Sequence, residues 1–164
     1  NEPTNSGTGA AALPLAEKVF EWARDVNPTQ PLTIGTWNRN KDLNQIIFQN
    51  SDIITFHNYH NSGKVAAEIA ALKAHGRPII NTEWLCRHQD STPEACLTLF
   101  ARENVGCMHW GLVNGRSQTH LHWGARPDKP EPKVWQHDLF HGDYKPYDND
   151  EIKLFRRTIG DHGK

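Results

Sequence analysis

The chain alternates between segments in which apolar residues recur every three or four positions and short segments in which apolar and β-branched residues are continuous. The first spacing is typical of amphipathic helices and the second of buried strands. Pro14 can occupy a first helical turn, and the helix that it opens is predicted to end at Asn27-Pro28. The apolar side chains that share one face of this helix are Leu15, Val19, Trp22, Ala23 and Val26.

The same alternation continues to the end of the chain. Strands are predicted at Leu32–Trp37, Asp52–His57, Ile79–Thr82 and Gly106–Trp110. Helices are predicted at Leu43–Gln49, around Val65, Ile69 and Leu72, at Thr92–Glu103, and around Ile152, Phe155 and Ile159. Strands that are separated by helices run parallel, so the fold class is α/β, either a barrel or an open sheet.

The polar and aromatic residues favour the barrel, because they collect where the predicted strands end. These residues are Trp37, His57, Tyr59, Glu83, Trp84 and Trp110. In a (β/α)8 barrel of the TIM type the carboxyl ends of the strands form the catalytic face. A complete barrel needs about 250 residues, whereas this chain has 164. We therefore expect residues 1–164 to form only the second half of the barrel, with strands 5 to 8 and the end of strand 4.

A half barrel exposes two sheet edges and one face of the sheet. It would be completed by a second copy in a homo-oligomer or by a missing amino-terminal half. Residue 1 is neither an initiator Met nor the start of a signal peptide, so we expect the native amino terminus to lie outside this sequence.

Residues 111–147 are predicted to form a long loop between the last strand and the last helix. Loops of this length are usually lids or other functional segments. An apolar patch inside the loop is expected to pack back on the body, and Trp135, like Trp22, is assigned to packing. The patch consists of Val134, Trp135, Leu139 and Phe140.

Composition and charge narrow the range of partners. An apolar fraction of 37% is compatible with a folded globular protein, and the formal charge of −1 gives no electrostatic reason to expect nucleic acid or an anionic membrane. No apolar run approaches the roughly 18 residues that a membrane span needs. The three cysteines lack CxxC spacing and are most simply free thiols, although one disulfide with one leftover thiol is the alternative. The near-zero net charge is more compatible with a neutral ligand.

Two glutamates give the strongest indication of chemistry. Glu2 lies in Asn1-Glu2-Pro3, and Glu83 directly follows the predicted strand Ile79–Thr82. Hydrolysis of a glycosidic bond needs one carboxyl group that protonates the leaving oxygen and a second that attacks the sugar or stabilises its positive charge. Two carboxylates at strand ends are therefore candidate catalytic residues of a glycosidase.

The chain resembles glycoside hydrolase clan A, and within it the cellulase and mannanase group, family five. The motifs that carry the resemblance are Asn1-Glu2-Pro3, Phe56-His57-Asn58-Tyr59-His60, Ile80-Asn81-Thr82-Glu83-Trp84, His109-Trp110-Gly111 and Lys129-Pro130-Glu131-Pro132-Lys133-Val134-Trp135. The resemblance implies a retaining enzyme, with Glu2 as general acid/base and Glu83 as nucleophile. It also implies that Asn1 binds the sugar 2-hydroxyl and that His57 or Tyr59 orients Glu83. Trp110 would form the floor of the subsite for the reacting sugar, and Trp37, Trp84 and Trp123 are candidates for neighbouring subsites.

Other functions are less well supported by the residues. His57, His60, His109, His120 and His122 suggest a metal, but His120 and His122 have no nearby carboxylate or thiol at a recognised ligand spacing, so we expect no metal and no cofactor. The sequence contains no Gly-x-Ser-x-Gly elbow, so this motif gives no support for a serine hydrolase. The alternative function is an inactive carbohydrate-binding or interaction module that keeps the aromatic subsites. A polymeric glycan substrate would place the protein outside the cytoplasm, either secreted or periplasmic.

Overall fold

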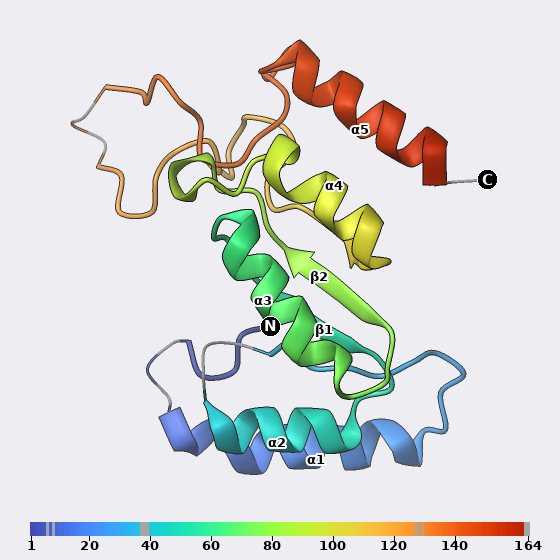
Figure 1. Ribbon diagram of the computed structural model, residues 1–164. Helices are drawn as coiled ribbons and strands as arrows, with labels where there is room; N and C mark the ends of the chain where they lie inside the picture. Colours follow the sequence, from blue (N-terminus) through green and yellow to red (C-terminus); the bar gives the residue numbers. More distant parts are fainter. Residues whose placement is uncertain (6, 8, 37–39, 127, 129, 163–164) are drawn as a thin grey trace.

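The computed structural model describes residues 1–5, 7, 9–36, 40–126, 128 and 130–162, and its elements follow the predicted order (Figure 1). In chain order they are η1 Gly9–Ala12, α1 Leu13–Asp25, α2 Lys41–Asn50, β1 Ile54–His57, α3 Ser62–Lys73, β2 Ile79–Glu83, η2 Arg87–Gln89, α4 Pro93–Glu103, β3 Gly106–Cys107 and α5 Asn149–His162. The α/β class is confirmed. The placement of the chain in the second half of a barrel stays a prediction.

The three strands form one parallel sheet in the order β1-β2-β3, as expected for strands joined by helices. The main core packs one face of this sheet against α3, α4 and α5, and its fully buried members include Ile54, Phe56 and Val65. A second core joins α1 to α2 through Ala16, Phe20, Leu43, Ile46 and Ile47. Figure 1 shows α1 and α2 together at one end of the molecule, with α5 at the other end.

Capping residues set where the helices begin. The side chains of Asn40, Asn61 and Thr92 each accept a hydrogen bond from a backbone N–H three residues later, at the starts of α2, α3 and α4. Such caps satisfy N–H groups that have no partner inside the helix. Asn104 then ends α4 in the left-handed conformation. These local signals explain why the predicted helix positions are confirmed.

The strand predictions need two corrections. Residues 32–36 are not a regular strand, because only the two ends of the segment pair with β1 or the residues before it. At one end the Leu32 carbonyl accepts the Asp52 N–H, and the Leu32 N–H donates to the Asp52 carboxylate. At the other end Thr36 forms an isolated parallel bridge to Phe56. The predicted strand at Gly106–Trp110 has only two ladder residues. The backbone after β3 nevertheless runs along β2. The Met108 N–H donates to the Asn81 carbonyl in β2, and the Trp110 N–H donates to the Trp84 carbonyl just after it.

The apolar face predicted for α1 is not the face that packs against the rest of the protein. Leu15, Trp22 and Val26 are more than half exposed, and Val19 is 36% exposed. Ala16 and Phe20 are buried instead, against α2. The assignment of Trp22 to packing therefore fails, whereas Trp135 is buried as expected. The periodicity correctly indicated a helix but could not indicate which side of it another element covers.

The loop at 111–147 contains no helix or regular strand in its described residues. Isolated bridges join Phe140 to Val113 and Pro146, and Leu139 is buried, so part of the loop packs on the body as predicted. Cys86, Cys96 and Cys107 are free thiols. None of the helices in the part of the chain that the structure describes is long and apolar enough to cross a bilayer.

Arg87, just after β2, connects this loop to α5. Its guanidinium forms two hydrogen bonds with the Glu151 carboxylate, at 2.9 and 2.6 Å, and both side chains are almost fully buried. It also donates to the carbonyls of Trp135 and Asp138, and it lies 4.5 Å from the centre of the Tyr147 ring. One buried cation therefore joins the segment after β2, the loop at 111–147 and α5.

We expect Arg87→Met to lower the free energy of unfolding by about 3–5 kcal/mol, because it leaves the buried Glu151 carboxylate without its partner. Lys153→Met is the matched control: it removes the exposed ion pair with Asp150 and should cost less than about 1 kcal/mol. Urea denaturation of both variants measures the difference. Equal losses would show that the Arg87 contacts do not hold the loop and α5.

Candidate functional site

An irregularity in the β1–β2 pairing brings His57 and Glu83 to the same face of the sheet. Phe56 pairs with Asn81, but His57 pairs with Glu83, so Thr82 is an extra residue in β2. Side chains alternate faces in a regular strand, and a bulge of this kind interrupts the alternation. The fully buried Asn81 side chain supports the bulge, because its Oδ1 accepts the Glu83 N–H at 3.1 Å. Asn81 is therefore a site residue that the sequence reasoning assigned no role.

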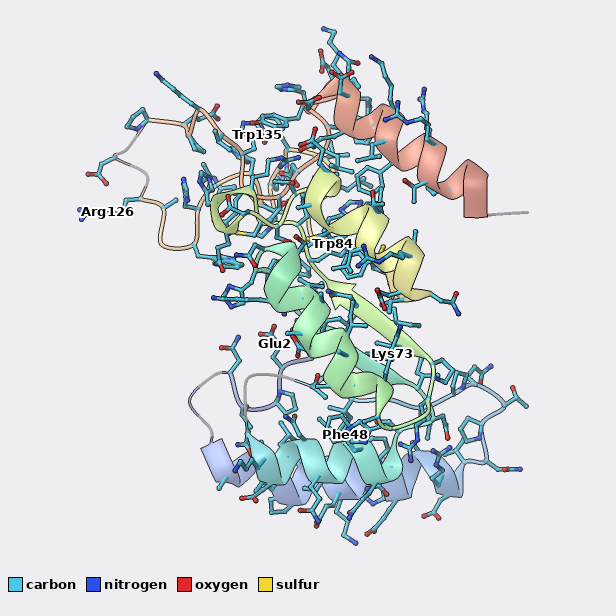
Figure 2. All side chains as sticks on the ribbon, viewed as in Figure 1. Glu2, Phe48, Lys73, Trp84, Arg126 and Trp135 are labelled. Atoms are coloured by element: carbon cyan, nitrogen blue, oxygen red, sulfur yellow. The ribbon has the colours of Figure 1, made fainter. Side chains whose placement is uncertain are left out.

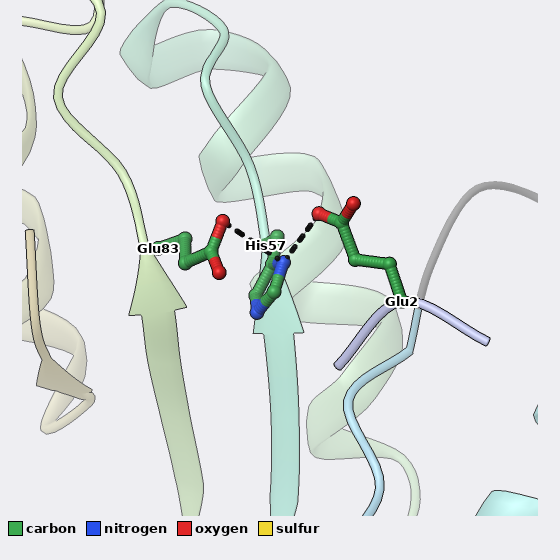
Figure 3. A group of neighbouring side chains, drawn as sticks. All are labelled: Glu2, His57 and Glu83. Carbon is green, nitrogen blue, oxygen red and sulfur yellow. Dashed lines mark hydrogen bonds and ion pairs between the residues drawn. The ribbon is translucent and has the colours of Figure 1, made fainter. Parts of the chain in front are cut away.

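The His57 imidazole lies between the two glutamates (Figure 3). Its Nδ1 is 2.6 Å from Glu2 Oε1 and 3.3 Å from Glu83 Oε2. All three side chains are nearly buried, with 5%, 11% and 12% of the His57, Glu2 and Glu83 side chains exposed. The structure thus brings both predicted catalytic residues together with His57, one of the two residues expected to orient Glu83.

A tight turn positions Glu2. The Asn5 N–H donates to the Glu2 carbonyl at 3.0 Å, with Pro3 at the second turn position, where its fixed φ is favourable. The turn also directs the Asn5 side-chain amide onto Glu2 Oε2. Both oxygens of the Glu2 carboxyl group therefore have partners. Asn5 was missed in the sequence reasoning, although the Glu-Pro-Thr-Asn turn pattern could have indicated it.

Tyr59 contacts the same Glu83 oxygen that faces His57. Its hydroxyl donates to Glu83 Oε2 at 2.7 Å, and burial together with this hydrogen bond raises the pKa of Tyr59, which keeps the phenol protonated. The exposed Trp123 packs edge-on against the Tyr59 ring at a centroid distance of 5.0 Å. His137 lies 5.4 Å from the same ring. Trp123, from the long loop, therefore contacts Tyr59, which in turn bonds Glu83.

A cavity of about 320 Å³ opens beside this group. Its walls include Asn1, His57, Thr82 and Glu83, together with Thr55 and residues 33–35 from the extended segment. Amide, hydroxyl, imidazole and carboxylate groups form much of this wall, and each can hydrogen-bond a hydroxyl group of a ligand. Asn1 and Glu83 thus share a cavity in which a sugar could contact both.

The predicted tryptophan subsites have different outcomes. The prediction for Trp84 is wrong, because its side chain is fully buried and packs against Phe100 and Phe155, where no sugar can reach it. Figure 2 labels Trp84 in the middle of the molecule. Trp110 is 44% exposed and follows β3, so its ring remains available. Trp37 lies outside the described residues.

Glu2, His57 and Glu83 also form a potential metal-binding group. One ligand atom from each lies within 4.8 Å of the other two. Imidazole and carboxylate are common ligands of zinc. The expectation of a site without metal was based on His120 and His122 rather than on these three residues, and it stays a prediction.

Comparison with known proteins identifies one family. The model described as cellulase, glycosyl hydrolase family 5, matches residues 1–116 of the 164 residues. The match includes Glu2, His57, Tyr59, Glu83 and Trp110, whereas Trp123 lies beyond it. No curated protein matches the chain.

Proposed function

We propose a catalytic role for the Glu2–Glu83 pair on one premise: the chain belongs to glycosyl hydrolase family 5, the cellulase family. The proposed function is hydrolysis of O-glycosidic bonds in a β-linked glycan or glycoside, with retention of configuration at the anomeric carbon. One observation carries the proposal. Two nearly buried carboxyl groups lie on either side of one imidazole, and the imidazole and the Glu83 carboxyl group line a polar cavity.

The separation of the two carboxyl groups favours retention over inversion. One oxygen of Glu2 and one oxygen of Glu83 lie within 4.8 Å of each other. Retaining enzymes place the two groups about 5–5.5 Å apart, whereas inverting enzymes separate them by about 6.5–9.5 Å to admit a water molecule. This oxygen–oxygen distance is closer to the retaining spacing than to the wider inverting spacing, and it supports direct attack by one carboxylate.

In the proposed reaction Glu83 attacks the anomeric carbon while the bond to the leaving oxygen breaks, and Glu2 gives its proton to that oxygen. Glu2 then takes a proton from water. The resulting hydroxide oxygen attacks the anomeric carbon, and the bond to Glu83 breaks. The contact between Glu2 Oε1 and His57 Nδ1 is compatible with either protonation state of Glu2, because the imidazole can accept or donate at this nitrogen.

The polar cavity and the exposed aromatic rings are assigned to sugar binding. Asn1 would hydrogen-bond the 2-hydroxyl of the reacting sugar, and Trp110 would form the floor beneath it. Trp123 would stack against the neighbouring sugar, because its ring is exposed and lies against Tyr59. A pure binding module would use the same rings, and only turnover separates the two functions.

The proposal is tested with aryl β-glycosides and with β-linked polysaccharides such as glucan, mannan and xylan. We expect release of a product whose first-formed anomer is β, as seen by proton NMR. An activated 2-fluoro-2-deoxy β-glycoside should leave one sugar bound to the peptide that contains Glu83, as seen by mass spectrometry. Sugar binding without any turnover would favour the binding module, and an initial α-anomer would contradict retention.

The hydrogen bond from Tyr59 to Glu83 provides a smaller test. We expect Tyr59→Phe to lower kcat by about 10²-fold, at the low end of the cost of removing one charge-stabilising donor. The phenol holds Glu83 in position and stabilises its charge when the carboxylate leaves the sugar. Tyr144→Phe, at an exposed tyrosine, is the control. An unchanged kcat in Tyr59→Phe would exclude Tyr59 from the reaction.

A further inference from the structure

The backbone just after Glu83 adopts an unusual conformation. Leu85, two residues further along the chain, has a φ of +75°, in the left-handed region that residues other than glycine rarely adopt. The residue is fully buried. A buried carbonyl needs a hydrogen-bond donor, and a backbone in this region persists only where its surroundings hold it. Contacts from outside β2 must therefore hold Leu85.

His137, from the loop at 111–147, supplies that donor. Its Nδ1 contacts the Leu85 carbonyl, and the residue is only 1% exposed. A carbonyl only accepts hydrogen bonds, so Nδ1 must carry a proton. Burial lowers the pKa of His137 and so favours the neutral ring, in which Nε2 is an acceptor.

Gln136 selects the same tautomer from the other side of the ring. Its side-chain nitrogen lies 2.8 Å from His137 Nε2. Its side-chain oxygen accepts the backbone N–H of Trp123 at 3.2 Å, which turns the amide nitrogen toward the histidine. Three hydrogen bonds therefore run in one direction, from the Trp123 N–H through Gln136 and His137 to the Leu85 carbonyl. We call the side chains of Gln136 and His137 the loop pair.

The loop pair also contacts the tyrosine that bonds Glu83. The His137 and Tyr59 rings lie 5.4 Å apart, and the Tyr59 hydroxyl donates to Glu83 Oε2 at 2.7 Å. The Gln136 carbonyl accepts the Arg87 N–H at 3.1 Å, which ties the loop backbone to the segment after β2. The loop pair thus acts on Glu83 by two routes, through the backbone after β2 and through the Tyr59 ring.

We propose that Gln136 and His137 are positioning residues for the nucleophile, holding the backbone at Leu85 and the Tyr59 ring in the arrangement from which Glu83 attacks. The proposal rests on the proposed function. Both residues lie beyond residues 1–116, which the family model matches. The long loop is thereby assigned a part in the reaction that differs from sugar binding.

A kinetic comparison at position 137 tests the proposal. His137→Phe keeps a ring of similar size against Tyr59 but removes the donor to Leu85. We expect kcat to fall about tenfold, because a small displacement of the reacting group costs rate. KM should stay within about twofold, the pattern of a group that acts only on the chemical step, since His137 is not among the described residues that line the cavity.

His137→Asn distinguishes positioning from a merely structural role. It restores an amide donor near the place of Nδ1, so kcat should return to within about threefold of the wild type, although the smaller side chain leaves a cavity. His141→Phe, at an exposed histidine of the same loop, is the control and should leave kcat unchanged. Urea unfolding midpoints are measured for each variant. A kcat that followed the midpoint rather than the donor would overturn the proposal.

Gln136→Met keeps the test decisive if His137→Phe fails to fold. It removes the donor to His137 Nε2 but leaves the imidazole in place, and it should lower kcat in the same direction as His137→Phe. An unchanged kcat in folded Gln136→Met would exclude Gln136 from the positioning role.

Nitrogen-15 NMR of the wild-type imidazoles tests the loop pair without turnover. We expect His137 to be neutral and protonated at Nδ1. A proton on Nε2 instead would overturn the proposal, because that tautomer has no donor for the Leu85 carbonyl. A wild-type chain with the expected tautomer but without turnover would overturn the proposed function and the positioning role with it. Turnover that His137→Phe leaves unchanged would overturn the positioning role alone.

Discussion

Glu83→Gln is expected to abolish turnover, with a fall in kcat of at least about 10⁴-fold, within the range that loss of a nucleophile costs other hydrolases with covalent intermediates. The substitution keeps the size of the side chain, and the amide oxygen can still accept the hydrogen bond from Tyr59. The amide nitrogen and oxygen are poor nucleophiles, so no bond to the sugar forms. Sugar binding should persist, and calorimetry with a β-linked oligosaccharide would measure it.

Glu94→Gln serves as the control for this experiment. Glu94 lies in the first turn of α4 and is exposed, so its replacement should leave kcat unchanged. The variant with Gln at position 83 should also fail to retain the fluorinated sugar that labels the wild type. Measurable turnover at more than about one hundredth of the wild-type rate would assign the nucleophile to another residue.

Glu2→Gln is expected to reduce activity by about 10²- to 10⁴-fold, the usual contribution of general acid–base catalysis. The size of the loss should depend on the leaving group. A good leaving group such as dinitrophenolate needs no proton, so the first step continues and the glycosyl enzyme accumulates as a burst. Added azide should then restore turnover, because it attacks the anomeric carbon without a general base, and the product should be a β-glycosyl azide.

The partner of Glu2 in the turn provides a comparison. Asn5→Ala removes the amide that contacts Glu2 Oε2 but leaves the carboxyl group in place, so its effect should be smaller and azide should not change it. If the loss in Glu2→Gln were equal for all leaving groups and insensitive to azide, Glu2 would be only a structural partner of His57.

The sequence was sufficient for the order and type of the helices. Spacing of apolar residues, proline at a first turn and asparagine or threonine caps are local signals, and each depends on a few neighbouring residues. The helices at 41–50, 62–73 and 93–103 were therefore predicted close to their observed bounds. Strands were less predictable, because a strand exists only when a neighbour pairs with it, and residues 32–36 pair only at their ends.

The candidate site was predicted in part. Glu2, His57, Tyr59 and Glu83 could be named because polar residues at strand ends and a family resemblance both indicated them. Trp84 has the same sequence signals, yet it is buried in the core. A residue after a strand can point into the cavity or into the core, and sequence alternation fails to distinguish them where a bulge interrupts it.

The sequence alone determined which residues can carry the chemistry and which segments form helices, because both depend on residue type and short-range spacing. Only the tertiary structure decided that His57 lies between Glu2 and Glu83, that Asn81 supports the bulge, and that the apolar face of α1 is exposed. Each of these features depends on contacts between segments far apart in the chain, and residue spacing alone does not specify those contacts.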